Sequence, residues 1–586
     1  MPLDHTHARR AGRFGLGCIR LLAGLLCGAG AASAAAPTAF EVSFPAALRP
    51  APLTGRILVF VAKEKSPEPR EALGLGAFIH GIPQFYGQDV TALPPGQTEV
   101  LAGAAEGYPN KRLGDLPAGD YFVQAVANVY TQCRRSDGHV VWVHLDQGEG
   151  QHAGMSPGNL VSEVTKVHLD ATAGFSVKLN LTKLLPPVPP PADTPWIKHV
   201  RLQSALVSKF WGQPMFLGAT ILLPKDYDSH PNVRYPVIYE QTHFGQGDNI
   251  PLHFSADGKP VPPVLMAWLK SFNYMTGYEM YKAWNGPNFP RFIAVTFQHA
   301  TPYYDDSYAV DSANNGPYGA AVTQELIPYL DAHFRTIPAG YARVLTGIST
   351  GGWESLALQL FHPEMFGGAW AAAPDPVDLR HYLLVNAYND DSAFDVREDN
   401  QWQSPVGDWF HPERPFSRGV DGQPFLTMRA DNQMEIAMGS HGRSGEQIDD
   451  WFAVAGPAGD DGYPKPLWDK HTGKIDHNVA AYMRDHGFDL RAYLHTHWQE
   501  LAPKLQGKLH IDVGDMDNYF LNMAVHDLQA EVENHAAPHL DAVFHYGRPE
   551  KGHGWQHTLM TGIIGEMADA ITAHTPPGQD AKAWRY

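Results

Sequence analysis

One pentapeptide of the chain has the residue types of a nucleophile for acyl transfer. Residues 347–351 read Gly-Ile-Ser-Thr-Gly, a G-x-S-x-G pattern. This pattern needs a strand before the serine and a helix after it, and the residue after the serine must donate its backbone N–H to the developing oxyanion. The apolar run 342–348 predicts the strand, and 352–361 predicts the helix. We therefore predict Ser349 as nucleophile and the Thr350 N–H as an oxyanion donor.

A second copy of the pattern, at 154–158, fails the same requirements. Pro157 follows Ser156, and proline has no N–H to donate. The flanking residues suggest neither a strand nor a helix. We interpret Ser156 as a chance match.

A serine hydroxyl needs a base to accept its proton, and the base needs a carboxylate to orient it. Where such a serine turn lies in an α/β sheet, the acid and then the histidine follow along the chain, just past strand ends. Asp515 and Asp517 follow one late predicted strand, and His553 and His557 follow the next. His553 is favoured as base because glycines flank it directly after the last strand, with His557 as the alternative. Asp517 is favoured as acid because it reaches further past its strand end than Asp515.

The remaining site predictions concern loops at the same edge of the sheet. A second oxyanion donor should come from the loop after the third strand, and we predict the Phe244 N–H. Five side chains near this edge are candidates to line a substrate pocket, with ordinary packing as the alternative: His243, Tyr303, Tyr304, Trp353 and Asp375.

The elements that must position these residues fall into two parts. Residues 38–185 contain short alternating strand patterns separated by turns, which predict a β-sandwich-like accessory domain. The proline-rich stretch 186–195 predicts a linker. From 196 to 580, strands alternate with helices, which predicts a doubly wound α/β sheet, with an insertion at 386–500. The eight predicted strands are 198–207, 215–224, 235–241, 291–298, 342–348, 368–374, 508–514 and 540–547.

The N-terminal residues and the overall charge restrict where the protein acts and what it binds. Residues 1–36 combine four arginines with an apolar stretch and the ending Ala-Ser-Ala, which predicts a cleaved signal peptide and export to the periplasm or the medium. No later segment is apolar enough to predict a membrane span in the mature chain. The net charge of −18 argues against a nucleic-acid binder.

Several motifs together resemble the putative-esterase family, which includes esterase D, the enterochelin esterases and the feruloyl esterases. The resemblance covers about 196–580 and rests on YPVIYEQTHFG, LTGISTGGWESLAL, FHPEMFGGAWAAAPD, GDMDNYFL and GHGWQH. It implies an α/β-hydrolase fold with Ser349, Asp517 and His553 as nucleophile, acid and base. The family has His-Gly after the third strand where this chain has His243-Phe244-Gly245.

These observations predict an exported serine esterase that acts on a small-molecule or polymer-linked ester. It should need no cofactor and no metal, because neither His495-Thr496-His497 with Glu500 nor acidic pairs such as Asp449-Asp450 have the spacing of a metal site. The acidic pairs are interpreted as solvated loops. Alternatives are a serine peptidase or acyltransferase with the same three residues, or a non-catalytic surface- or carbohydrate-binding protein with a degenerate hydrolase fold.

Overall fold

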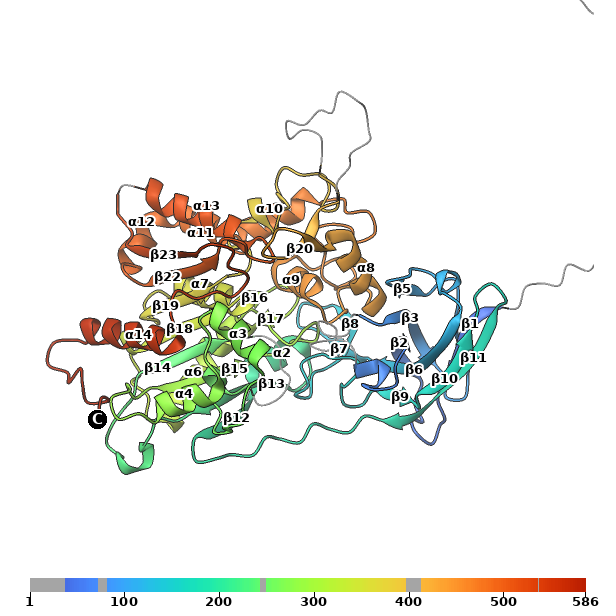
Figure 1. Ribbon diagram of the computed structural model, residues 1–586, viewed down its shortest axis with the longest axis horizontal. Coiled ribbons are helices and arrows are strands. Elements are labelled where there is room, and N and C mark those ends of the chain that lie inside the picture. The colour runs from blue at the N-terminus through green and yellow to red at the C-terminus, as the bar shows by residue number, and fades with distance from the viewer. Residues whose placement is uncertain (1–36, 72–81, 243–248, 397–412, 536) are drawn as a thin grey trace, which may run out of the picture.

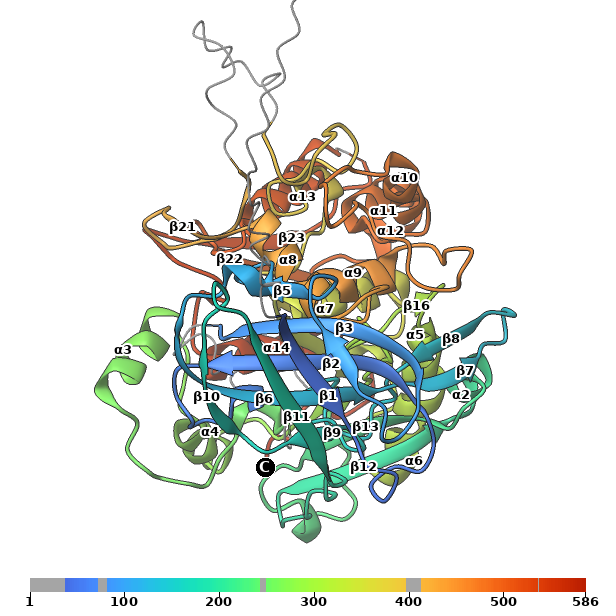
Figure 2. The same ribbon diagram turned by 90° about the vertical axis from the view of Figure 1, so that its right-hand side faces the viewer.

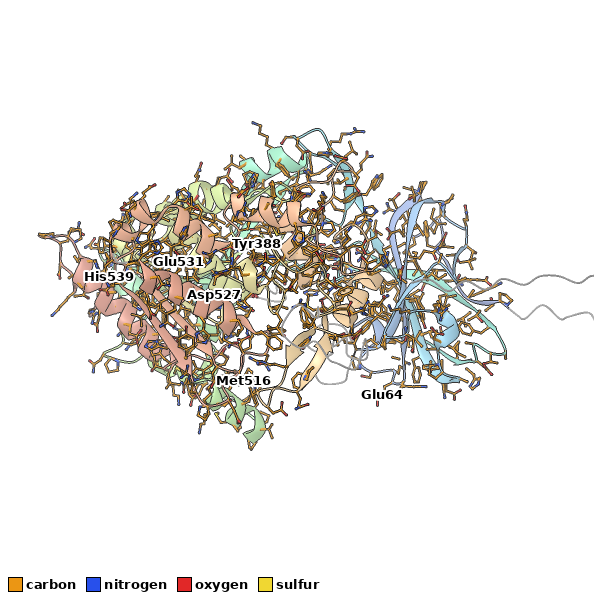
Figure 3. All side chains as sticks on the ribbon, turned by 90° about the horizontal axis from the view of Figure 1, so that it is seen from above. Glu64, Tyr388, Met516, Asp527, Glu531 and His539 are labelled. Carbon is orange, nitrogen blue, oxygen red and sulfur yellow. The ribbon has the colours of Figure 1, made fainter. Side chains whose placement is uncertain are left out.

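The computed structural model describes residues 37–71, 82–242, 249–396, 413–535 and 537–586. A large α/β unit and a smaller β-rich unit lie side by side (Figure 1). Seen from above, Glu64 of the β-rich unit and His539 of the α/β unit lie toward opposite ends of the molecule (Figure 3).

The α/β unit is built on an eight-stranded sheet in the order β12-β13-β15-β14-β18-β19-β22-β23. β13 is antiparallel to β12 and β15, and the other neighbours run parallel. The central strands are continuous apolar runs, as strands buried on both faces should be. All eight predicted strands are present, which confirms the α/β-hydrolase fold class. Their bounds are β12 Ile197–Ser204, β13 Met215–Leu222, β14 Val237–Gln241, β15 Ile293–Gln298, β18 Arg343–Ile348, β19 Gly368–Ala372, β22 Leu509–Gly514 and β23 Ala542–Gly547.

Helices connect and cover these strands. The helical segment at 318–333 is interrupted: α5 continues through a π turn, Val322–Leu326, into α6. Pro328 has no N–H for the regular helical bond, which accounts for the irregular turn just before it. The helices outside the insertion are α2 Ala205–Trp211, α3 Pro263–Ser271, α4 Gly277–Trp284, α5 Tyr318–Ala321, α6 Ile327–His333, α7 Thr350–Phe361, α12 Trp498–Leu501, α13 Leu521–Asn534 and α14 Met560–His574.

The N-terminal unit is a nine-stranded sheet that folds over on itself. β1 and β11 lie across β2, β3 and β6 (Figure 2), and apolar side chains from both layers, such as Phe40 and Val59, share one core. This matches the expected β-rich accessory unit. Its strands are β1 Thr38–Ser43, β2 Leu53–Ala62, β3 Gln84–Leu93, β4 Glu99–Leu101, β5 Glu106–Tyr108, β6 Gly119–Val129, β9 Leu160–Ser162, β10 Thr165–Leu169 and β11 Phe175–Leu184.

The two units contact each other through more than the exposed stretch 186–195. A separate hairpin, β7 (Thr131–Arg134) and β8 (Val140–Val143), places Cys133 and Val141 in the core of the α/β unit. On the other side, Arg56 of β2 donates to the carbonyl of Ala437 at 3.1 Å.

The contact between Arg56 and Ala437 is made by the insertion at 386–500. Ala437 lies on α8 (Met428–Met438), which packs against β3 and β5. The other insertion elements are the β20 (Pro415–Arg418) and β21 (Pro424–Thr427) hairpin and the helices α9 Gln447–Ala455, α10 His477–Asp485 and α11 Leu490–Thr496. Among the described residues, none of the helices is long and apolar enough to cross a bilayer.

Candidate active site

Ser349 lies on a strained turn between β18 and α7. Its φ of 60° and ψ of −123° are values that a non-glycine residue rarely adopts. The turn is held because the Ser349 N–H donates to the Ala372 carbonyl at 3.0 Å, while the Ser349 carbonyl accepts from Trp353 N–H at 3.1 Å. The serine side chain is half-buried at the carboxyl edge of the sheet.

The two glycines of the pattern are required by close backbone contacts. A Cβ at Gly351 would lie 2.0 Å from the Gln241 carbonyl oxygen of β14, and a Cβ at Gly347 would lie 2.3 Å from the Gly351 oxygen. Any side chain at either position would push the helix away from the sheet. The sequence pattern therefore reflects close packing of the turn.

His553 and Asp517 are brought together at the ends of two neighbouring parallel strands. Asp517 follows β22 and His553 follows β23, and His553 Nδ1 lies 2.9 Å from Asp517 Oδ2. The Asp517 side chain is fully buried, and its other oxygen, Oδ1, accepts from the N–H groups of Tyr519 and Leu521 at 2.9 and 3.2 Å. These bonds fix the carboxylate, which in turn fixes the imidazole ring.

The backbone and ring of His553 have further support from the Asp517 loop. Asn518 Oδ1 accepts from the His553 N–H at 2.8 Å, and the Tyr519 ring meets the imidazole edge-on at 4.9 Å between centroids. Burial of His553 disfavours its charged form, but the charges of Asp517 and Asp375 and the Asp517 hydrogen bond outweigh burial and raise the pKa of His553.

Asp375, predicted only as a pocket-lining residue, lies in direct contact with the serine. Ser349 Oγ donates to Asp375 Oδ1 at 3.2 Å, while Tyr308 and Thr350 donate their hydroxyls to Oδ2 at 2.6 and 2.9 Å. Burial raises the pKa of Asp375, although these hydrogen bonds oppose the shift.

Gln447, from α9 of the insertion, completes this group and was missed by sequence reasoning. Its Nε2 donates to the Tyr308 hydroxyl at 2.5 Å and to Thr350 Oγ1 at 3.2 Å. Gln447 is almost 100 positions from the serine and in no motif, so no signal in the sequence could have identified it.

The predicted oxyanion donors are only partly described. Thr350 is the first residue of α7, so its N–H has no acceptor within the helix. The group lies at the N-terminal end of the helix, where an oxyanion could accept from it. Phe244 and His243 lie outside the described residues.

The three remaining pocket candidates are largely buried. Trp353 is completely buried and packs edge-to-face against Tyr308 and Trp451, beneath the serine turn. Tyr303 and Tyr304 are 1% and 4% exposed. In this structure these rings support the loop that follows β15, so any contact with substrate stays a prediction.

The residues that were weighed against the favoured ones lie elsewhere or have other partners. Ser156 is buried and donates its hydroxyl to the His152 carbonyl at 2.8 Å. His557 lies between Asp512 and Glu566, at 2.8 Å from each, and its pKa is raised to about 9. Asp515 accepts from the Lys551 N–H at 3.1 Å.

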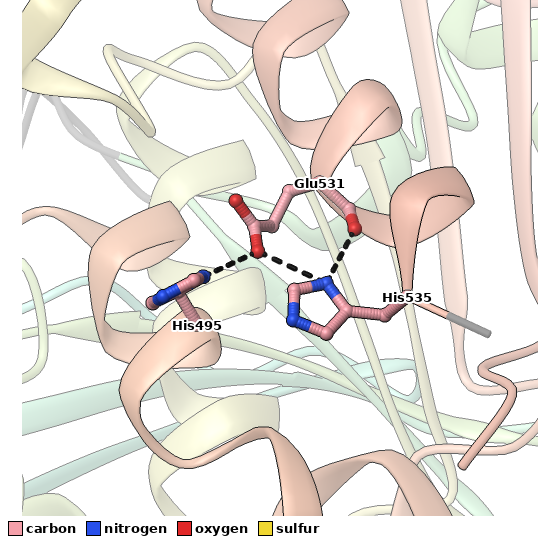
Figure 4. Close-up of side chains that lie close together, drawn as sticks. All are labelled: His495, Glu531 and His535. Atoms are coloured by element: carbon pink, nitrogen blue, oxygen red, sulfur yellow. Dashed lines mark hydrogen bonds and ion pairs between the residues drawn. The ribbon is translucent and has the colours of Figure 1, made fainter. Parts of the chain in front are cut away.

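His495, which the sequence groups with His497 and Glu500, has different neighbours in the structure. His495 lies on α11 beside Glu531 and His535 of α13, and Glu531 Oε1 is 2.7 Å from His495 Nδ1 and 3.1 Å from His535 Nδ1 (Figure 4). Arg491 also pairs with Glu531 at 3.1 Å. The cluster has the composition of a surface ion-pair network.

The expectation that the acidic pairs are solvated is wrong for Asp449-Asp450. Both side chains are on α9 and buried, at 2% and 0% exposed. The sequence predicts no helix at this position, which is the reason for the expectation of a loop. Asp460-Asp461 are exposed, as expected.

Comparisons with known proteins place the chain in a family. The family model described as Putative esterase matches residues 215–564, more than half of the chain. No curated protein sequence matches the chain.

Similar solved structures include three hydrolases. A ferulic acid esterase is 15% identical, covers 64% of this chain and 99% of its own, and has a TM-score of 0.29. FphF, a fluorophosphonate-binding serine hydrolase of Staphylococcus aureus, is 11% identical, with 64% and 98% covered and a TM-score of 0.32. An S-formylglutathione hydrolase from Agrobacterium tumefaciens is 12% identical, with 65% and 96% covered and a TM-score of 0.28.

Proposed function

Because the chain belongs to the Putative esterase family and is thus a carboxylic ester hydrolase, we propose that it is an exported serine esterase acting through Ser349, His553 and Asp517. The observation that carries the proposal is the hydrogen bond between His553 and the buried Asp517 at the sheet edge that also holds Ser349. Export to the periplasm or the medium is proposed from residues 1–36, which lie outside the described residues.

In the first step of the proposed reaction, the Ser349 hydroxyl leaves Asp375 and hydrogen-bonds to His553 instead. Nδ1 of His553 is engaged by Asp517, so Nε2 is the nitrogen available to take the Ser349 proton. A rotation of the serine side chain away from Asp375 would present Oγ to Nε2. Oγ then attacks the ester carbonyl carbon, and the oxyanion is stabilised by the Thr350 N–H and a second donor from the loop after β14.

The second half of the reaction reuses the same groups. His553 returns its proton to the leaving alcohol as the tetrahedral intermediate collapses to an acyl-enzyme. Water gives a proton to His553 and attacks the acyl carbon. His553 then passes this proton to Ser349 Oγ as the acid leaves, which restores the free serine and the neutral imidazole.

A fluorophosphonate probe tests the proposal on the purified mature chain. We expect covalent labelling at Ser349 and turnover of part of a panel of acyl and aryl esters. Failure of both labelling and turnover in the folded protein would favour the non-catalytic alternative. Assays with amide substrates and alcohol acceptors separate an esterase from a peptidase or acyltransferase.

Activity should fall toward acid pH, with a midpoint above the ordinary histidine value of about 6.5. Only neutral imidazole can act as base, and the pKa of His553 is raised because the charges of Asp517 and Asp375 outweigh burial. Asp375→Asn removes one of these charges, so the midpoint of kcat/KM should move to lower pH. Asp515→Asn is the control and should leave the midpoint in place. A profile that is flat from about pH 5 to 8 in folded protein would refute the role of His553.

Thr350→Pro should lower kcat by about 10²–10³, because it deletes one oxyanion donor, typically worth about 3 kcal/mol, and strains the turn at Ser349. Thr350→Val keeps the N–H and loses only the hydroxyl that bonds Asp375. Steady-state kinetics and melting temperatures of both variants check the assignment. Equal losses in the two variants would indicate that the hydroxyl, rather than the N–H, matters.

A further inference from the structure

Three carboxyl groups are buried together beneath the serine turn. Asp306 follows β15, Glu354 lies on α7 shortly after Ser349, and Asp450 lies on α9 of the insertion. All three side chains are 0% exposed. The proposed reaction uses none of them, although Asp306 Oδ1 accepts a hydrogen bond from the Tyr308 N–H.

These groups lie close enough to influence one another strongly. His299, Asp306 and Glu354 each have one atom that could bind a metal, and these three atoms lie within 4.8 Å of one another. Asp450 is placed beside them by its neighbour Trp451, whose ring packs on that of Trp353, the neighbour of Glu354, at 5.4 Å between centroids. The charge of Asp306 adds to burial in raising the pKa of Asp450. The four residues therefore form one group, which we call the elbow cluster: His299, Asp306, Glu354 and Asp450.

Most of the carboxylate oxygens in the elbow cluster have no hydrogen-bond donor. Among the described residues, no partner is present for Asp306 Oδ2, for either oxygen of Glu354 or for either oxygen of Asp450. In the described parts of the chain, no lysine or arginine forms an ion pair with any of the three, and only His299 approaches, at 3.6 Å from Asp306 and from Glu354. Ionised carboxylates buried without partners are strongly unfavourable, so something must neutralise them.

His299 does not supply the missing positive charge. Its Nδ1 accepts a hydrogen bond from the Ser307 N–H at 3.1 Å, so this nitrogen carries a lone pair. The neutral ring then has its proton on Nε2, which faces Glu354. Burial lowers the pKa of His299, although the charge of Asp306 opposes the shift.

We propose that Asp306, Glu354 and Asp450 bind a calcium ion that ties the serine helix to the loop after β15 and to the insertion. Calcium takes six to eight oxygen ligands at 2.3–2.6 Å in flexible geometry, so ligands on opposite sides of the ion lie about 5 Å apart. The span of 4.8 Å, which holds for His299, Asp306 and Glu354, fits this size. Five unpartnered oxygens approach the required number.

The donor set favours calcium over other common metals. Zinc prefers a histidine lone pair, but the His299 nitrogen that faces Glu354 carries a proton. His299 therefore offers no lone pair to a metal on the side that faces Glu354. Magnesium keeps several of its waters and requires a regular octahedron, which a fully buried cluster of carboxylates suits poorly.

The competing explanation is that the carboxyls share protons. Burial and the neighbouring charges raise the pKa of Glu354 well above its ordinary value, which is compatible with a protonated acid in a protein without metal. The two explanations differ in one respect: only a calcium site makes stability depend on the concentration of the ion.

The decisive measurement is the metal content and melting temperature of the full mature protein. We expect about one calcium per chain by elemental analysis, and a melting temperature that falls by about 5–10 °C in excess EGTA and recovers with added CaCl₂. Magnesium should restore less. No bound calcium together with a melting temperature insensitive to EGTA and CaCl₂ would overturn the proposal, as would stoichiometric zinc.

Two variants and one control assign any calcium effect to the elbow cluster. Glu354→Gln and Asp450→Asn should abolish the rise in melting temperature with CaCl₂, whereas Asp460→Asn, at an exposed position of the same insertion, should keep it. A full calcium response in both cluster variants would place the ion elsewhere and refute the site. If a variant fails to fold, the metal content and EGTA response of the unsubstituted protein still decide whether calcium binds.

Discussion

Ser349→Ala is expected to lower kcat for ester hydrolysis by about 10⁶, the order of loss that removing the nucleophile causes in a serine protease. The fold should survive, because the serine side chain is half-buried and its hydrogen bond to Asp375 is worth about 1 kcal/mol. Measurement of kcat on one ester, with circular dichroism and a melting curve on the same sample, checks both statements.

The chain contains a matched control for this variant. Ser156→Ala changes the serine of the second G-x-S-x-G pattern, which is buried and bonded to the His152 carbonyl. It should lower stability by about 1 kcal/mol and leave kcat unchanged. If the two substitutions reduced activity equally, Ser349 would not be the nucleophile.

The catalytic sheet could be predicted from the sequence because its strands carry an unambiguous signal. Strands buried on both faces, such as β14 and β18, appear as continuous apolar runs bounded by turn residues. The N-terminal sheet was predicted less completely. β4, β5 and β9 have three residues each, too short for a visible alternation.

The insertion was the least predictable part, because its helices are positioned by tertiary contacts. α8 begins with buried Met428 and carries buried polar residues such as Asn432 and Glu435, which weaken the apolar periodicity of a surface helix. Glu435 is buried because Lys470 pairs with it from a distant segment. The sequence close to Glu435 does not indicate that Lys470 is its partner.

Site residues were predicted where local sequence places them and were missed where tertiary contacts do. Ser349 follows β18 directly and His553 lies in the loop after β23, so local sequence is enough to place them at the sheet edge. Gln447 and the elbow cluster depend on how an insertion folds back over α7. The expectation that no metal is needed stays a prediction, because ligand spacing along the chain does not test for carboxylates that separate segments bring together.

Asp517→Asn is expected to lower kcat by about 10⁴, as the corresponding change does in a serine protease. The structure gives a specific reason. Because the Tyr519 and Leu521 N–H groups both donate to Oδ1, an asparagine would keep its carbonyl oxygen there. Its NH₂ would then face His553 Nδ1 and donate to it, which forces the ring proton onto Nε2. In that tautomer Nε2 cannot accept the proton of Ser349.

Asp515→Asn is the comparison that makes this prediction specific, since it alters the same loop by the same chemistry. Asp515 accepts a hydrogen bond from the Lys551 N–H, and an asparagine oxygen can still accept it. The variant should lose less than about tenfold in kcat, or about 1.4 kcal/mol. Both purified variants are compared on one ester at a pH where His553 is neutral, with melting temperatures to confirm folding. A larger loss in Asp515→Asn than in Asp517→Asn would reassign the acid to Asp515, and equal small losses would mean that neither carboxylate orients the base.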